Sequence, residues 1–450
     1  MAKFLEKIAN FSGKCLIYED TSYTYKDLCE KIEQKGRLLE NLPQGSTIAI
    51  LGDYDMDSIS MLFACYQHKM IVAPLTQSSQ SREALQKAQI EETQIEEAQI
   101  EYVYTHNSLN ATGLKRTNDL FTRLQNTSGL ILFSSGSTGK PKVIVHDLDT
   151  FLESYLHKPH NPTRTLSIFL PDHVAGIDVM LSVLSTGGSL VIPKARRPKD
   201  ILQAIEKYKV EILPAPPTML RLLLLSDIQK YNTDSLKLVI YGSEKMHENL
   251  LKVLQKILPN TKFKQSFGTS ETNAIKTKNH EMQEGYFKIL NCNYKILNNE
   301  LFLKSKTQSL GYLNADNSVF DEQGYFATGD LVEVIESNGE EYIKIIGRSK
   351  EIINVGGEKV LPSEVESILL EIPYIQDCLV YGESNAITGQ SVSVKVVLDS
   401  SLECKNLTNI ELKSRIRAYC KEKLSAFKIP TKVSIVKSLQ INARFKKTRR

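Results

Sequence analysis

Residues 134–142 bring small, hydroxyl-bearing and basic side chains together in one short loop, Ser-Ser-Gly-Ser-Thr-Gly-Lys-Pro-Lys. Glycines let backbone N–H groups turn toward one point, where they form a concave nest for anionic oxygens. The hydroxyls add hydrogen-bond donors and the lysines add positive charge. This composition predicts a loop that holds the phosphates of ATP. The residues expected to do so are Ser134, Ser135, Gly136, Ser137, Thr138, Gly139 and Lys140.

The spacing of this loop disfavours the commoner phosphate-binding loop. A Walker A loop, G-x-x-x-x-G-K-[ST], joins a strand to a helix. Here Pro141 follows the Gly139-Lys140 pair, and Ser134 stands where the first glycine is required. Both flanking runs are apolar and strand-like, so the loop is expected to join two strands. On this loop alone, a Ser/Gly turn with no ligand remains the alternative.

Composition restricts the class of protein. The chain has 450 residues, 41% hydrophobic and 24% charged, as in soluble globular proteins, and it is long enough for a large core. A net charge of +4 gives no reason to expect nucleic acid as a partner. No signal peptide and no membrane span are expected, since no apolar run approaches ~18 residues. The seven cysteines form no C-x-x-C pair, which argues against a zinc site or disulfides and favours the cytoplasm.

The elements that position the loop follow an alternating pattern. Residues 46–51 and 71–74 are typical of buried strands, and residues 58–69 between them are typical of a helix. Residues 238–241 and 262–267 read as further core strands. This alternation predicts layered α/β structure.

A short repeat interrupts this pattern at residues 89–101, QIEETQIEEAQIE. Ile90, Ile95 and Ile100 do not share one helical face, because five residues advance a helix by a net rotation of about 140°. A solvated helical insertion is therefore expected, and no function is assigned to it.

The loop resembles the signature of a known family. Residues 135–142 are similar to the motif of the adenylate-forming superfamily, which comprises acyl-CoA synthetases, luciferase and the adenylation domains of peptide synthetases. Val143 stands where that motif has glycine. Further motifs follow in the family's order between Tyr23 and Arg449. An ordered series of matches is far harder to produce by chance than a single one.

The resemblance implies the architecture. It predicts an α/β fold with a large N-terminal domain of stacked α/β layers and a β-barrel subdomain, residues 1–348. A small, mobile α+β domain, residues 349–450, is expected to carry the catalytic lysine. The active site would lie between the two domains.

The resemblance also assigns the nucleotide site to motifs far apart in the sequence. Residues 265–271 are similar to the family's aromatic-G-x-T-E segment, and Phe267 would offer a ring face for stacking on adenine. Glu271, with Thr138, is expected to hold Mg²⁺, which binds one or two carboxylates together with substrate phosphates. Ser270 keeps the hydroxyl of the usual threonine as a catalytic residue. The other nucleotide-binding residues implied are Gly242, Ser243, Glu244, Gly268, Thr269, Asp330 and Arg348.

Two of these side chains have specific expected roles. The Asp330 carboxylate can accept hydrogen bonds from both ribose hydroxyls, because it has two oxygens and no donor. The guanidinium of Arg348 is a permanently charged fork for ribose or phosphate oxygens.

The family's second half-reaction implies moving parts. Lys350 falls on the hinge position, and Gly356-Gly357 fall on a turn that borders a tunnel for the thiol, where the lack of side chains lets a pantetheine arm pass. Lys446 falls on the catalytic lysine, and Lys447 is the neighbouring alternative.

The acid pocket is the least specified part. Residues 170–178, LPDHVAGID, resemble a segment that flanks the acid in acyl-CoA and aryl-CoA synthetases, so His173 is expected to gate the pocket. As a lone residue it would more often be a structural histidine. Asp178, unusual in an apolar run, is a candidate for binding a substrate amino group.

These observations predict ATP-dependent activation of a carboxylic acid to an acyl-adenylate, followed by transfer to a thiol. The expected cofactors are ATP and Mg²⁺, with CoA as co-substrate. One alternative is a stand-alone adenylation enzyme that loads an amino or other acid onto the phosphopantetheine of a carrier protein. A second alternative is a non-catalytic nucleotide-binding relative, because Val143, Gln440 and Phe445 depart from the family pattern.

Overall fold

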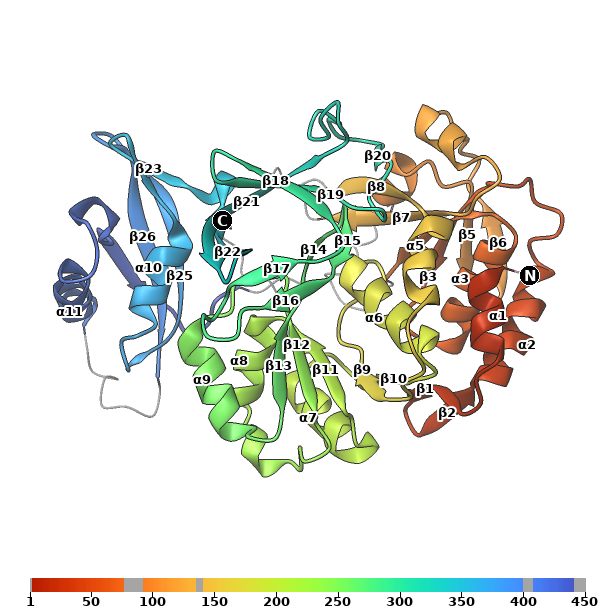
Figure 1. Ribbon diagram of the computed structural model, residues 1–450, viewed down its shortest axis with the longest axis horizontal. Helices are drawn as coiled ribbons and strands as arrows, with labels where there is room; N and C mark the ends of the chain where they lie inside the picture. The colour runs from red at the N-terminus through yellow and green to blue at the C-terminus, as the bar shows by residue number, and fades with distance from the viewer. Residues whose placement is uncertain (1, 77–91, 135–140, 400–407, 441–450) are drawn as a thin grey trace.

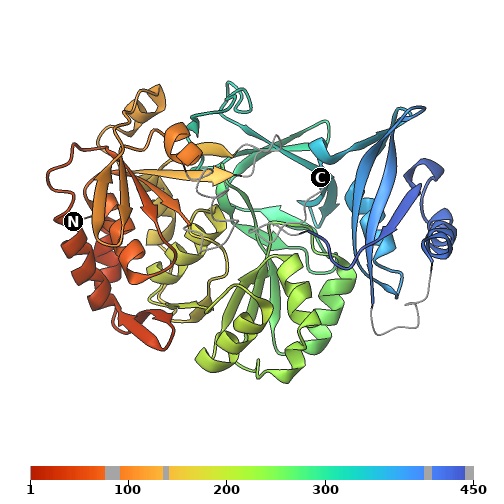
Figure 2. The same cartoon turned by 180° about the vertical axis from the view of Figure 1, so that it is seen from behind.

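A computed structural model describes residues 2–76, 92–134, 141–399 and 408–440. The N-terminal part and the C-terminal part of the chain lie at opposite ends of the molecule, with the antiparallel strands β21 and β22 between them (Figures 1 and 2). Residues 135–140 of the expected phosphate loop and Lys446 lie outside the described residues.

The first large sheet is parallel apart from one edge strand, and its order is β13-β12-β11-β9-β10-β1-β2. The parallel arrangement brings the carboxyl ends of β9, β11, β12 and β13 to one edge, where open sheets bind ligands. Its strands are β1 (Lys14–Tyr18), β2 (Thr21–Thr24), β9 (Arg164–Leu166), β10 (Ser189–Ile192), β11 (Ile212–Ala215), β12 (Leu238–Tyr241) and β13 (Lys262–Gln265).

The second large sheet has the order β20-β8-β7-β4-β3-β5-β6 and carries the phosphate loop between β7 and β8. These two strands pair antiparallel from Gly129–Asp147 to Ser134–Lys142, so the loop joins two strands as predicted. The strands are β3 (Thr47–Leu51), β4 (Ile71–Leu75), β5 (Tyr102–Thr105), β6 (Ser108–Ala111), β7 (Gly129–Ser134), β8 (Lys142–Asp147) and β20 (Gly311–Tyr312).

Helices cover both faces of the sheets, and this explains the unbroken apolar run of β7. Leu130 and Leu132 pack into the main core cluster, whereas Ile131 and Phe133 pack into a second cluster on the other face. A strand buried on both faces needs no polar alternation. The helices are α1 (Lys3–Ala9), α2 (Tyr25–Gly36), α3 (Met56–Gln67), α5 (Leu148–Leu156), α6 (Val174–Ser185), α7 (Pro198–Tyr208), α8 (Pro217–Leu225) and α9 (Glu248–Ile257).

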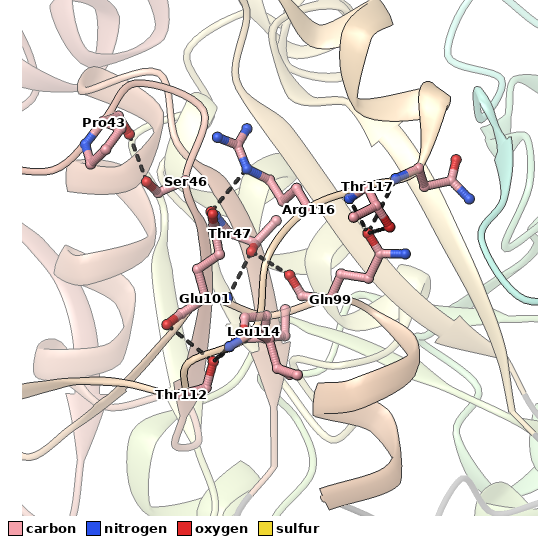
Figure 3. A network of polar contacts seen from close by, with 11 residues as sticks. Pro43, Ser46, Thr47, Gln99, Glu101, Thr112, Leu114, Arg116 and Thr117 are labelled. Atoms are coloured by element: carbon pink, nitrogen blue, oxygen red, sulfur yellow. Dashed lines mark hydrogen bonds and ion pairs between the residues drawn. The ribbon is translucent and has the colours of Figure 1, made fainter.

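The end of the 89–101 repeat is packed, which corrects the expectation of a solvated insertion. Residues 92–97 form a helix, and Ala98 and Ile100 are fully buried in the second core cluster. Gln99 has a positive φ of 53°, which turns the chain so that these two apolar side chains point inward. Thr47 bonds both sides of this turn, because its hydroxyl donates to the Gln99 carbonyl at 2.7 Å and its N–H donates to Glu101 (Figure 3).

A third, antiparallel sheet forms the β-rich subdomain, in the order β16-β17-β22-β21-β19-β18. A two-stranded ribbon of β14 and β15 lies beside it. The strands are β14 (Phe267–Thr269), β15 (Asn273–Ile275), β16 (Thr277–Asn279), β17 (Phe287–Ile289), β18 (Asn293–Leu297), β19 (Glu300–Lys304), β21 (Phe326–Ser337) and β22 (Glu340–Arg348).

The residues after β22 have a hydrophobic core of their own, from Ile353 to Val433. The division at 348/349 stays a prediction, although β22 ends at Arg348. No helix in the described ranges is long and apolar enough to cross a membrane. The elements are β23 (Ile353–Val355), β24 (Glu358–Val360), α10 (Pro362–Leu369), β25 (Ile375–Asn385), β26 (Gly389–Leu398), α11 (Asn409–Lys421) and β27 (Lys432–Ile435).

Candidate functional site

A cleft of about 1820 Å³ lies where the first sheet, the antiparallel sheet and α10 meet. It collects side chains that are up to two hundred residues apart in the sequence. The predicted site residues that line it are Ser134, His173, Gly242, Ser243, Glu244, Phe267, Gly268, Thr269, Ser270, Glu271, Asp330, Arg348 and Lys350.

Of the predicted site residues that the structure describes, two do not line this cleft. Gly356 and Gly357 form the turn between β23 and β24, and a Cβ on Gly357 would meet nothing within 4 Å. In this domain arrangement they therefore lie outside the cleft, and their role beside a thiol tunnel stays a prediction. The predicted hinge residue Lys350 lies in a short 3₁₀ turn, Ser349–Glu351, directly after β22.

The turns after β12 and β13 bring backbone together at the expected adenine position. A Cβ on Gly242 would lie 2.6 Å from the Ser266 carbonyl oxygen, and one on Gly268 would lie 2.4 Å from the Asn273 oxygen. Only glycine fits such close approaches. The Phe267 ring packs on Phe287 with centroids 5.3 Å apart and remains partly accessible.

The Glu244 side chain bonds within the protein, and its contact with a nucleotide stays a prediction. Its Oε2 accepts hydrogen bonds from Thr218, from the hydroxyl at 2.6 Å and from the N–H at 3.2 Å. These contacts attach the turn after β12 to the first turn of α8. Glu244 therefore holds the shape of the turn, and Gly242 and Ser243 present the backbone.

The Glu271 carboxylate is 9% exposed and is oriented by a neighbour that the motifs did not reveal. The hydroxyl of Tyr312, on β20, donates to Glu271 Oε1 at 2.7 Å. Lys142 Nζ lies 4.2 Å from the centroid of the same ring. Burial lowers the pKa of Lys142, and the Glu271 carboxylate opposes that shift. Tyr312 is 41 residues from Glu271 in the sequence, and no motif signals its role.

Ser270 precedes Glu271 and is fixed through its backbone. Nε2 of His146, on β8, lies 2.9 Å from the carbonyl oxygen of Ser270. Because that oxygen can only accept, the ring proton is on Nε2. His146 is 1% exposed, and burial lowers its pKa to about 4. The ring is therefore neutral at pH 7 and acts as a donor.

Asp330 and Arg348 form the ion pair of the site. They stand opposite each other on β21 and β22, and Arg348 Nε lies 2.7 Å from Asp330 Oδ1. Asp330 is 4% exposed and its N–H donates to the Thr328 hydroxyl. The ion pair holds the buried carboxylate of Asp330 against the guanidinium of Arg348 inside the cleft.

His173 is the N-cap of α6. Its Nδ1 accepts the Ala175 N–H at 3.2 Å, and its ring stacks on Phe169. The structure thus gives it the structural role that a lone histidine would be expected to have, while it still lines the cleft.

Asp178 also lines the cleft, one turn further along α6. Its Oδ1 accepts the Tyr155 hydroxyl at 2.7 Å, and its charge raises the pKa of the nearby Lys158 against the effect of burial. Asp178 therefore faces a cation of the protein itself.

Comparison with known families decides what this cleft belongs to. Residues 85–311 match the family model of the AMP-binding enzymes, and residues 364–446 match that of the AMP-binding enzyme C-terminal domain. The chain belongs to the AMP-binding enzyme family.

Curated relatives within the family match nearly the whole chain. The 2-succinylbenzoate–CoA ligase of Staphylococcus epidermidis is 25% identical, with 97% of this chain and 94% of the relative covered. The enzyme of the same name from Bacillus subtilis is 23% identical, with 95% of this chain and 92% of the relative covered.

Solved structures share the fold. The anthranilate–CoA ligase AuaEII in complex with anthranoyl-AMP has a TM-score of 0.81 at 20% identity, over 99% of this chain and 95% of that one. The o-succinylbenzoate–CoA synthetase of Bacillus subtilis, in complex with its acyl-adenylate intermediate, has a TM-score of 0.79 at 22% identity. The match covers 100% of this chain and 97% of that one. The predicted α/β fold is confirmed.

The membership settles the class of reaction. The chain is an AMP-forming acid–thiol ligase, which activates a carboxylic acid as an acyl-adenylate. One solved structure of the Bacillus subtilis o-succinylbenzoate–CoA synthetase, which shares the fold, holds ATP and a magnesium ion. The non-catalytic alternative is not supported. The predicted side chains of the cleft can now be considered as the machinery of an AMP-binding enzyme.

Proposed function

We propose that this enzyme activates an aromatic acid of the 2-succinylbenzoate class, and that the residues lining the cleft perform the reaction. The relatives that match the chain almost end to end carry that activity in their names. The observation that carries the assignment of residues is the convergence of Phe267, Glu271, Asp330 and Arg348 in one cleft, from four strands or turns.

In the first step a substrate carboxylate oxygen attacks the α-phosphorus of ATP, the bond from that phosphorus to the bridging oxygen breaks, and pyrophosphate leaves. Phe267 stacks on adenine, while Asp330 and Arg348 bind the ribose and phosphate oxygens. Such a reaction depends on positioning and on charge stabilisation. Lys446 supplies positive charge at the α-phosphate in this proposal.

The donor set fits Mg²⁺. Glu271 is a nearly buried carboxylate inside the cleft, held by Tyr312. No group of three or more metal-ligating side chains occurs in the described part of the chain. One carboxylate suits an ion whose other ligands are phosphate oxygens and water. When bound, the ion supplies positive charge that offsets the charge of the phosphates.

In the second step a thiol attacks the acyl carbonyl carbon, a C–S bond forms and AMP leaves. The position of Gly356-Gly357 away from the cleft supports a rotation about Lys350 between the steps. We favour CoA over a carrier protein as the thiol, since the relatives are named CoA ligases. The free thiols of all the described cysteines suit the proposed cytoplasmic location.

The test is ATP–pyrophosphate exchange with 2-succinylbenzoate, followed by CoA-dependent release of AMP. We expect exchange in the wild type and a loss of roughly 10²- to 10³-fold in Glu271→Gln, since that change removes one preorganised charge. Glu322→Gln is the matched control, because Glu322 is exposed and does not line the cleft. Exchange with an amino acid but not with 2-succinylbenzoate would contradict the proposed substrate class. Equal losses in both variants would contradict the role of Glu271.

A further inference from the structure

The cleft continues beyond the nucleotide residues along a face of α6. A helix of twelve residues is about 18 Å long. The part of the cleft lined by this face is called the α6 channel. The polar residues on this face are four positions apart in the sequence, and small or apolar residues lie between them. The residues of α6 and its C-cap that line the channel are Val174, Ala175, Asp178, Val179, Ser182, Val183 and Thr186.

The channel receives a lysine from the neighbouring helix. Helices α5 and α6 lie side by side (Figure 1), and Lys158 follows the end of α5. Lys158 lines the cleft, its Nζ donates to the Ser182 hydroxyl at 2.7 Å, and it lies 4.6 Å from the centroid of the Tyr155 ring. An ammonium group has three donors, and the serine accepts one of them.

The surroundings of this lysine form a built polar pocket. The Tyr155 hydroxyl donates to Asp178 and accepts from Asn273 Nδ2 at 3.1 Å. Asn273 is 2% exposed, lines the cleft, and its Oδ1 has no hydrogen-bond partner among the described residues. Buried polar atoms in proteins are nearly always satisfied, so this unpartnered acceptor at the cleft wall marks a place for a hydrogen-bond donor, such as a water that bridges to a ligand.

The sign of the charge favours an anionic ligand. Burial lowers the pKa of Lys158, Asp178 opposes this shift, and the nearby Lys264 adds to it. The negative charge of Asp178 is thus balanced by Lys158, and Lys264 adds a further positive charge nearby. A substrate ammonium would be repelled by Lys158, whereas a carboxylate would meet the two ammonium donors of Lys158 that bond to no described residue.

We propose that Lys158 determines acid specificity by binding a second carboxylate of the substrate, about 10 Å along the α6 channel from the nucleotide end. This inference rests on the proposed function, since it needs the acid to occupy the channel. It makes the enzyme selective for dicarboxylic over monocarboxylic aromatic acids. Lys158 is a binding residue here, and Ser182 and Tyr155 position it.

The experiment compares 2-succinylbenzoate with its two monocarboxylic analogues, 4-oxo-4-phenylbutanoate and 2-butanoylbenzoate, by ATP–pyrophosphate exchange. In the wild type kcat/KM should favour the dicarboxylate by about 10- to 100-fold over the better analogue, which is the size of a hydrogen bond to a charged group. Lys158→Met should remove this preference by raising KM for the dicarboxylate. Lys158→Arg should keep most of the preference.

Lys207→Met is the matched control. Lys207 also lies over a tyrosine ring, 5.3 Å from that of Tyr208, but it is outside the cleft. This variant should keep the wild-type preference.

Other outcomes decide against the inference. The role of Lys158 is overturned if the wild type is active and Lys158→Met keeps its preference for the dicarboxylate. It is also overturned if Lys158→Met lowers kcat/KM equally for all three acids. Either result leaves the proposed function intact. A wild type that shows no exchange with any acid contradicts the proposed function. In that case calorimetric binding of 2-succinylbenzoate to wild type and Lys158→Met decides the inference: weaker binding by the variant supports it, and equal or absent binding overturns it.

Discussion

The hydroxyl of Tyr312 donates to Oε1 of Glu271 at 2.7 Å, and so joins a strand of one sheet to the turn between two strands of another. Tyr312 lies on β20, which pairs with β8 beyond the phosphate loop, and Glu271 follows β14. The side chain of Lys142 covers the same ring. The Tyr312 phenol therefore links the proposed metal ligand to the phosphate-loop hairpin, beside the contact of His146 with the Ser270 carbonyl.

Replacing Tyr312 by Phe removes this hydrogen bond and keeps the ring. The carboxylate then loses its fixed orientation, and a hydrogen bond to a charged group is worth enough to slow adenylate formation by about tenfold or more. We expect the Mg²⁺ concentration for half-maximal ATP–pyrophosphate exchange to rise as well, which a purely structural effect would not cause. Magnesium titrations of the exchange rate measure both.

Tyr294→Phe is the control for that change. Tyr294 donates to Glu341 at 2.6 Å, a tyrosine–glutamate pair of similar geometry that does not line the cleft. An unchanged magnesium dependence in Tyr312→Phe, or the same change in Tyr294→Phe, would argue that the contact with Glu271 has no catalytic role.

Asp330→Asn tests the proposed ribose site. The amide keeps the shape but carries no charge, so it weakens the ion pair with Arg348 and gives the ribose hydroxyls one acceptor oxygen instead of two. We expect KM for ATP to rise by about tenfold, with a smaller change in kcat. The control is Asp321→Asn, whose carboxylate pairs with Lys295 at 2.7 Å outside the cleft. A normal KM for ATP in Asp330→Asn would exclude the ribose role.

The buried His146 predicts how stability depends on pH. Its pKa is about 4 in the folded protein, against 6.5 for an unperturbed histidine, so the unfolded chain binds the proton more readily. The contribution of the neutral, buried His146 to the free energy of unfolding is therefore fully present above pH 6.5 and is lost as the pH falls toward 4. Linkage gives a loss of about 2 kcal/mol between pH 7 and pH 5 from this group.

Urea unfolding of wild type and His146→Gln at the two pH values checks this expectation. The glutamine amide can still donate to the Ser270 carbonyl but does not titrate, so the variant should lose less stability on acidification. His106→Gln, at an exposed position, should behave like the wild type. Identical pH slopes in wild type and His146→Gln would show that His146 is not the titrating group.

The sequence predicted the elements near the site well, because their signals are local. Residues 238–241 form β12 as expected, and the helix expected at 58–69 is α3, Met56–Gln67. The two apolar runs around the phosphate loop pair as β7 and β8. Periodicity and apolar runs suffice where a strand or helix is buried along its length.

Other features depend on distant contacts and could not be predicted. The packed end of the 89–101 repeat follows from a turn at Gln99 that no helical period anticipates. Tyr312, His146 and Lys158 act through partners more than twenty residues away. The motif around Glu244 likewise gave no sign that its side chain bonds to Thr218, and the predicted nucleotide contact stays a prediction.

Lys446 offers a test that separates the two half-reactions. If it stabilises charge at the α-phosphate, Lys446→Ala should abolish ATP–pyrophosphate exchange, by roughly 10²- to 10³-fold. Transfer from pre-made acyl-adenylate to CoA should remain largely intact, because in that step AMP is already the leaving group. Lys447→Ala is the matched control and should keep both activities. Loss of exchange in Lys447→Ala with normal exchange in Lys446→Ala would move the catalytic role to Lys447. Equal loss of both half-reactions in Lys446→Ala would contradict a role confined to adenylation.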